Sequence, residues 1–162
     1  MRKIFLVLLL LILTTGISYA DRGDQFLIPK IGFMSIDLNN ADPLYSIGVM
    51  YGYGITPEIT VEGEFNLGFS GGSSDLGDYD IWTVAGYGVY RFAFTDRQYL
   101  KAKLGLLHEN VEVGVGSASD SGLAGGIGYG IKANQTVIEI EATVIDKDII
   151  FYSAGINYPF NF

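Results

Sequence analysis

Apolar and polar residues alternate along most of the chain, in short segments that are separated by turn-forming residues. In the segment Val137–Ile145, for example, Ile138 and Ile140 alternate with Glu139 and Glu141. A period of two places successive side chains on opposite faces of a β-strand. We find no helical pattern after residue 20. The predicted strands are Gln25–Ser35, Tyr45–Ile55, Ile59–Phe69, Asp80–Phe92, Tyr99–Val111, Leu123–Lys132, Val137–Ile145 and Ile150–Phe162.

The connections between these eight predicted strands differ in length in a regular way. Short connections follow the second, fourth and sixth strands, at 56–58, 93–98 and 133–136. Longer connections, rich in Asp, Asn, Gly and Ser, follow the first, third and fifth strands, at 36–44, 70–79 and 112–122. Only 146–149 is short on the long-loop side. The pattern predicts an all-β fold, an eight-stranded antiparallel up-and-down transmembrane β-barrel with its short turns on the periplasmic side.

One face of the predicted strands is apolar, and its aromatic residues lie near both ends. Those near the short turns are Tyr53, Tyr158, Phe160 and Phe162, and those near the longer loops are Tyr45, Phe69, Tyr79 and Tyr152. Two aromatic girdles are typical of a membrane barrel. The other face carries glycine, small polar residues and charge, which cannot form the core of a soluble barrel without a large desolvation cost.

The fourth predicted strand is apolar on both faces, so alternation defines its orientation weakly. Its lipid-facing residues are predicted to be Ile81, Ala85, Tyr87 and Val89. This orientation places Gly86 and Gly88 in the interior, together with the glycines of the other strands.

The first twenty residues have the layout of a secretory signal peptide. Arg2 and Lys3 precede the apolar run Ile4–Leu13, and Ser18-Tyr19-Ala20 is a small-x-small cleavage site. The apolar run has about half of the roughly 20 residues that a spanning helix needs. We therefore predict that 1–20 is a cleaved signal peptide and that 21–162 is the barrel domain.

Composition excludes several other classes of protein. The 162 residues include no Cys, which excludes a disulfide scaffold, a cysteine zinc site and a Cys nucleophile. Eighteen acids against ten bases give a formal net charge of −8, so no nucleic-acid partner is expected. The 22 glycines include Gly126-x-Gly128-x-Gly130, but a phosphate-binding loop must open a helix, and none is predicted there. No cofactor and no metal are expected.

The segment 153–160, Ser-Ala-Gly-Ile-Asn-Tyr-Pro-Phe, resembles the C-terminal signal that the barrel-assembly machinery recognises. The matching residues are Gly155, Tyr158 and Phe160, and Phe162 keeps the phase and supplies a terminal Phe. Together with the signal peptide and the eight strands, this resembles the small eight-stranded outer-membrane β-barrel family of Gram-negative bacteria (porin-like, OmpA/OmpX-type). The resemblance implies a monomer in the cell outer membrane, assembled by that machinery and in contact with outer-membrane lipid and lipopolysaccharide. A host or surface ligand is left open.

Charged residues on the predicted interior face alternate in sign around the barrel. They are Lys30, Glu62, Glu64, Lys101, Lys103, Lys132, Glu139 and Glu141. The lumen of an eight-stranded barrel is only just filled by side chains, and buried charge is tolerable only when it is paired. We expect a salt-bridged plug, which suits envelope structure or surface interaction such as adhesion. The alternative is a proton, ion or small-solute channel.

An enzymatic role is not predicted. In this family, lipid A deacylases carry a His-x-Ser pair on a lipid-facing strand, whereas here His108, the only His, is followed by Asn110 at the Ser position. Ser117, Ser119 and Ser121 lie in the following predicted loop, where sequence spacing pairs none of them with His108. A lipid A-modifying hydrolase is thus a distant alternative, and no catalytic residue is assigned.

The predicted outward loops are acidic. They contain Asp37, Asp42, Asp75, Asp78, Asp120, Asp146 and Asp148 against the single base Lys147. We interpret these carboxylates chiefly as solvated loop residues, and bridging to lipopolysaccharide through divalent cations is the alternative use.

Overall fold

The computed structural model describes residues 22–36, 42–70, 72–74, 77–113, 116–133, 136–146 and 149–160. Its strands are β1 Gln25–Ile36, β2 Leu44–Gly54, β3 Ile59–Ser70, β4 Ser73–Ser74, β5 Gly77–Thr95, β6 Gln98–Val113, β7 Gly116–Ala133, β8 Thr136–Asp146 and β9 Ile149–Phe160. Within these ranges no helix has the length and apolar composition needed to cross a membrane. The predicted signal peptide lies outside the described residues, as do Asp37, Asp75, Lys147, Asp148 and Phe162.

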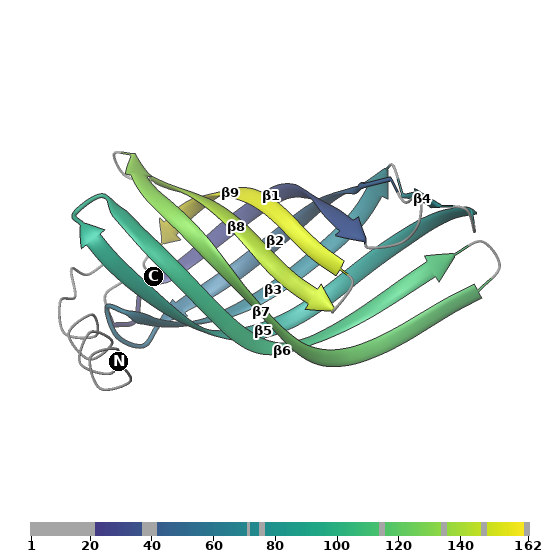
Figure 1. The fold of residues 1–162 in the computed structure, drawn as a ribbon. Coiled ribbons are helices and arrows are strands. Elements are labelled where there is room, and N and C mark those ends of the chain that lie inside the picture. The colour runs from purple at the N-terminus through teal and green to yellow at the C-terminus, as the bar shows by residue number, and fades with distance from the viewer. Residues whose placement is uncertain are drawn as a thin grey trace, which may run out of the picture.

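The long strands close into a barrel (Figure 1). Each pairs antiparallel with its neighbour along the chain, and β1 pairs with β9 to close the ring. The two-residue β4 pairs only with the start of β5, so that β3 pairs directly with β5 in the wall of the barrel. The predicted all-β, eight-stranded antiparallel barrel is therefore confirmed.

Three neighbouring strands are longer than predicted. β5, β6 and β7 have 19, 16 and 18 residues, whereas β1 has 12. Figure 1 shows the β6–β7 hairpin extending beyond the ends of β8 and β9. The expected loop at 112–122 is wrong, because β7 already begins at Gly116 and pairs with Val113. This segment has no apolar alternation, since both of its faces are exposed where it leaves the barrel.

The orientation predicted for the fourth strand, now β5, is wrong. Tyr87 and Ala85 point into the barrel, and Gly86 lies on the exposed outer face. Backbone register decides this: Tyr87 lies opposite Glu62 and Ala85 opposite Glu64. Directly opposed residues of a strand pair share a face, so the inward glutamates on β3 fix the inward face of β5.

Ile81 and Val89 follow Tyr87 into the lumen, and Gly88 follows Gly86 outward. The inward face of β5 therefore carries mainly apolar side chains, whereas the sequence pattern predicts glycine on that face.

Glycines inside the barrel make room for large side chains. A Cβ on Gly52 would lie 2.0 Å from the ring of Phe26, and a Cβ on Gly130 would lie 2.2 Å from the ring of Tyr99. Gly63, by contrast, lies on the exposed outer face, and a Cβ there would meet no atom within 4 Å.

Gly52→Ala is therefore expected to lower the free energy of unfolding by about 1–3 kcal/mol, because the Phe26 ring must move within a packed interior. Gly63→Ala is the matched control and should change it by less than about 0.5 kcal/mol. Urea unfolding of the two variants in lipid vesicles measures both values. Equal effects of the two substitutions would contradict the packing described here.

Candidate functional site

The lumen is divided into layers along the barrel axis, and the inward residues of β1 show the order. Phe26 and Ile28 come first, Lys30 follows, and Met34 comes last, all of them buried. At the end nearer the short turns, Phe26, Ile28 and Met50 form a small apolar cluster. Toward the opposite end lies a larger apolar cluster: Met34, Leu44, Tyr79, Ile81, Ala85, Tyr87, Val89, Leu107, Ala124, Ile145, Ile149 and Phe151. Charged residues occupy the layer between the two clusters.

One part of the charged layer joins β1 and β6 to β3 and β8. Lys30 Nζ lies 2.9 Å from Glu64 Oε2 and 2.5 Å from Glu141 Oε2. Lys103 Nζ lies 2.8 Å and 3.1 Å from the same two oxygens. The side chains of all four residues are 1% exposed. Two ammonium groups are thus shared between two carboxylates.

The other part of the layer contains Arg91, Lys101, Glu62 and Glu139. Arg91 Nη2 lies 2.7 Å from Glu62 Oε1, and its Nη1 donates to Thr60 Oγ1 at 3.1 Å. Lys101 Nζ lies 2.9 Å from both Glu62 Oε2 and Glu139 Oε2.

Lys101 also links the two parts, because its ammonium contacts Glu141 Oε1 as well. It therefore contacts three carboxylates from two strands.

Aromatic rings complete the surroundings of the cations. The guanidinium of Arg91 lies 4.7 Å from the ring centroid of Phe26, and Lys103 Nζ lies 4.4 Å from that of Tyr87. The Tyr99 hydroxyl donates to Glu139 Oε1. Cation–π contacts of this kind strengthen when the cation is removed from water. Four buried acids thus face four buried bases, and the layer carries no formal net charge.

The composition of this layer differs from the sequence-based prediction at two residues. Lys132 is exposed at the end of β7 and is not part of the layer. Arg91 is 3% exposed and takes the place of the fourth base. The sequence pattern missed Arg91 because this residue lies on the face of β5 that the pattern predicts to point toward lipid. Lys132 keeps the expected phase, but it lies too near the strand end to enter the lumen.

The outward face of the barrel is apolar. Exposed side chains include Ile31 at 63%, Leu104 at 66% and Ile127 at 70%. Tyr53 and Tyr158 lie outward near the short turns, and the outward aromatics of the opposite end are Tyr45, Phe69 and Tyr152. A continuous apolar surface with aromatic ends fits a lipid environment.

Tyr79 does not belong to the predicted girdle. Its side chain is buried, and its hydroxyl donates to the Asp42 carbonyl oxygen at 2.5 Å. Like Arg91, it lies on the inward face of β5, where register rather than alternation sets its orientation.

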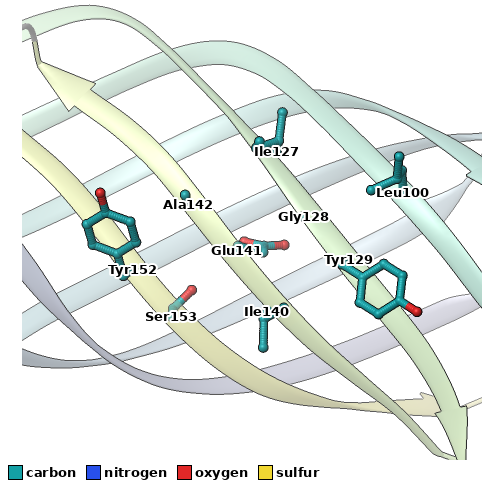
Figure 2. Close-up of a pocket in the computed structure, with 9 residues that line it drawn as sticks. All are labelled: Leu100, Ile127, Gly128, Tyr129, Ile140, Glu141, Ala142, Tyr152 and Ser153. Carbon is teal, nitrogen blue, oxygen red and sulfur yellow. The ribbon is translucent and has the colours of Figure 1, made fainter.

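A pocket of about 380 Å³ lies against β6, β7, β8 and β9 (Figure 2). It lies where the small outward side chain of Ala142 is set between larger outward neighbours such as Ile127, Tyr129 and Ile140. Because its outward lining is apolar, the pocket is a depression in the lipid-facing wall.

A pair of polar residues interrupts the apolar outer face on the β6–β7 hairpin. His108 Nδ1 lies 2.8 Å from Ser121 Oγ, and the two residues are directly opposed across the strands. Two residues further along β6, on the same face, Asn110 Nδ2 donates to Ser119 Oγ at 2.8 Å. The outward orientation expected for His108 is confirmed, whereas its proximity to Ser121 was not expected.

No protein-family model matches the chain, and no curated protein matches it either. Solved structures do match. The outer membrane protein OprG from Pseudomonas aeruginosa aligns with a TM-score of 0.67 at 13% identity, over 88% of this chain and 99% of OprG. Neisserial surface protein A aligns with a TM-score of 0.59 at 17% identity, over 85% of this chain and 96% of the neisserial protein.

Ail, the attachment invasion locus protein of Yersinia pestis, solved in complex with the heparin analogue sucrose octasulfate, aligns with a TM-score of 0.57 at 18% identity. That alignment covers 86% of this chain and 99% of Ail. The chain has the fold of the small outer-membrane β-barrels. At these identities the likeness concerns the fold alone.

The predicted assembly signal of this outer-membrane-type barrel lies on β9, the strand that closes the ring with β1. Gly155 is buried against Ile28, and Tyr158 is exposed on the outer face. Recognition of these residues and of Phe160 by an assembly machinery remains a prediction.

Of the acidic residues expected in loops, Asp42, Asp78 and Asp120 are exposed and Asp146 is half-buried. Asp78, Asp120 and Asp146 lie on strands, not in loops. Among the described residues no group of three or more His, Cys, Asp or Glu side chains is arranged to hold a metal ion.

Proposed function

We propose that the chain is an integral outer-membrane barrel whose lumen is closed, and that it serves envelope structure or surface interaction rather than transport. The observation that carries the proposal is the buried layer of four acids and four bases between two apolar clusters. A conducting pore needs a continuous path for water. Here each charged side chain of the layer forms an ion pair with a residue of opposite sign, and apolar side chains lie on either side of the layer.

The extended β5–β7 sheet supports a surface role. Its strands leave the barrel at the end opposite the short turns, which is the extracellular end of a barrel of this type. From Gly116 to Leu123 every residue of β7 is exposed. Such a surface can contact a protein on another cell, or lipopolysaccharide where divalent cations bridge the like charges.

The ligand is expected to differ from the sulfated one in the Ail structure. The exposed end of this barrel carries Asp42, Asp78 and Asp120, and the chain has a formal net charge of −8. Charge of the same sign repels a polyanion, and exposed charges steer association over about a Debye length.

A deletion strain tests the role in the cell. Loss of the protein is expected to raise sensitivity to bile salts, to lower adhesion to host cells, or both, and restoration by the intact gene checks the assignment. A second version, in which 110–119 is replaced by an Asn-Gly turn, separates the two roles because it removes the tip of the hairpin but keeps the barrel. Bile resistance without adhesion assigns adhesion to the hairpin. A deletion strain that behaves as wild type in both assays would overturn the proposal.

A small-solute or ion channel is the alternative, because rows of buried charge also occur along proton and ion paths. Uptake of a small sugar by vesicles that contain the purified barrel distinguishes the two. We expect the swelling rate of these vesicles to equal that of protein-free vesicles, since the side chains of the charged layer are buried against one another. Swelling at the rate given by a general porin would favour the channel.

A further inference from the structure

The contact between His108 and Ser121 brings a base and a hydroxyl together on the outer wall of the barrel. The two residues lie on β6 and β7, and Nδ1 of the histidine is 2.8 Å from the serine Oγ. A serine hydroxyl is a weak nucleophile at its ordinary pKa, and an adjacent histidine that can take its proton activates it. The distance between the two atoms is within the range required for that transfer.

The imidazole of His108 is also held from a second side. The ring of Trp82, on the neighbouring strand β5, contacts it edge-on with 5.6 Å between the ring centroids. The side chain of Asp120, in turn, accepts a 2.7 Å hydrogen bond from the backbone N–H of Ser121. These contacts restrict the imidazole ring of His108 and the backbone at Ser121, which favours a constant geometry of the pair.

An apolar groove of about 410 Å³ begins at this pair and continues along the lipid-facing wall. Its outward walls are Val84 and Leu106, and His108 and Ser121 border it. The groove exists because Gly86 has no side chain, although a Cβ there would meet no atom within 4 Å. A larger side chain would therefore fit at position 86 without a clash, but it would fill the groove.

From this geometry we infer that Ser121, with His108 as its base, attacks a carboxylic ester whose hydrocarbon chain lies in the groove. The inference goes beyond the proposed structural and surface role. The carbonyl carbon of an ester is the expected target because a serine activated by histidine is an acyl-transfer nucleophile. The position of the groove selects the rest of the substrate, since an apolar groove in a lipid-facing wall is open to acyl chains of membrane lipids.

The reaction proceeds in two balanced steps. Ser121 Oγ bonds to the carbonyl carbon while His108 Nδ1 takes the hydroxyl proton, and the ester C–O bond then breaks as His108 returns that proton to the departing alcohol. A water molecule next attacks the acyl-serine and gives its proton to His108. The bond to Ser121 Oγ breaks, and the proton passes to that oxygen, so a free fatty acid is released and the pair is restored.

The neighbouring pair of Asn110 and Ser119 supplies a control within the same hairpin. Its serine is also outward, and the O···N distance is again 2.8 Å. The amide nitrogen of Asn110 is a hydrogen-bond donor and not a base, so it cannot take the proton of the Ser119 hydroxyl. Ser119 should therefore be inert although its setting is otherwise similar to that of Ser121.

Covalent labelling of the folded protein in detergent by a small alkyl fluorophosphonate tests the nucleophile. We expect one label per chain on Ser121, lost in Ser121→Ala, reduced at least about a hundredfold in His108→Gln, and retained in Ser119→Ala. Gel mobility without heating shows that each variant is folded. An unlabelled wild-type protein would overturn the inference, as would labelling that survives Ser121→Ala or His108→Gln.

Hydrolysis of nitrophenyl esters of different chain length tests the groove. The wild-type barrel is expected to cleave the dodecanoate faster than the butyrate. Gly86→Leu fills the groove and should lower the dodecanoate rate by at least about tenfold, with labelling of Ser121 by the small fluorophosphonate unchanged. Equal dodecanoate rates for wild type and Gly86→Leu would show that the groove does not hold the substrate. Because none of these assays depends on lumen closure, their failure leaves the proposed function standing.

Discussion

Lys101→Met is expected to lower the free energy of unfolding of the barrel by about 3–5 kcal/mol. Lys101 contacts the carboxylates of Glu62, Glu139 and Glu141, and its side chain is 1% exposed. Removal of its ammonium leaves negative charge among side chains that are almost fully buried, and the apolar clusters above and below cannot solvate it. The cost of burying that charge then appears as lost stability.

Lys132→Met is the matched control, because it removes the same group from an exposed position at the end of β7. It should change the free energy of unfolding by less than about 0.5 kcal/mol. Urea unfolding in lipid vesicles, followed by fluorescence of the single tryptophan, measures both variants. Comparable losses in the two variants would contradict the assignment of Lys101 to a buried layer.

Arg91→Met alone should also cost about 3–5 kcal/mol, and the double variant Arg91→Met/Glu62→Leu should cost clearly less than the sum of the two single changes. Arg91 Nη2 and Glu62 Oε1 are 2.7 Å apart, with side chains 2% and 0% exposed. When both partners are removed together, neither leaves an unpaired charge. We expect a coupling energy of at least about 1 kcal/mol.

The same unfolding measurement on the four members of this cycle gives the coupling energy. As a control, Arg91→Met combined with Lys132→Met should be additive within about 0.5 kcal/mol, because the two residues do not share a partner. A cycle of Arg91 and Glu62 that is additive within the same margin would mean that the pair contributes nothing through direct contact.

Alternation of apolar and polar residues predicted the eight strands of the barrel wall, and their number, the connection lengths and the signal peptide together predicted a membrane barrel. Alternation succeeded where one face meets lipid and the other carries glycine or charge, as in β8, where Ile138 and Ile140 face outward and Glu139 and Glu141 inward. The physical reason is that the two faces of such a strand meet opposite environments.

The pattern failed in β5 because its two faces are similarly apolar. Trp82 and Val84 alternate with Ile81 and Ala85, so the strand can be placed in either phase by composition. Its pairing with Glu64 on β3 settles the phase, and that contact depends on which residues of distant segments are opposed. Local propensity carries no such information.

The contact between His108 and Ser121 could not be predicted for a related reason. Ser121 belongs to a polar segment without alternation, which is typical of a loop. Its position opposite His108 follows from the register of a hairpin that extends past the rim of the barrel. The Lys132 error has a different origin, because a residue can have the inward phase and still lie beyond the lumen.

Conductance of the purified wild-type barrel in a planar bilayer tests most directly whether the lumen is closed. A general porin inserted under the same conditions shows that the bilayer supports channel activity. With the paired charges of Lys30, Lys101, Lys103 and Arg91 held between two apolar clusters, we predict no conductance above the bare bilayer. Stable, stepwise conductance comparable to that of the porin would contradict the closed lumen.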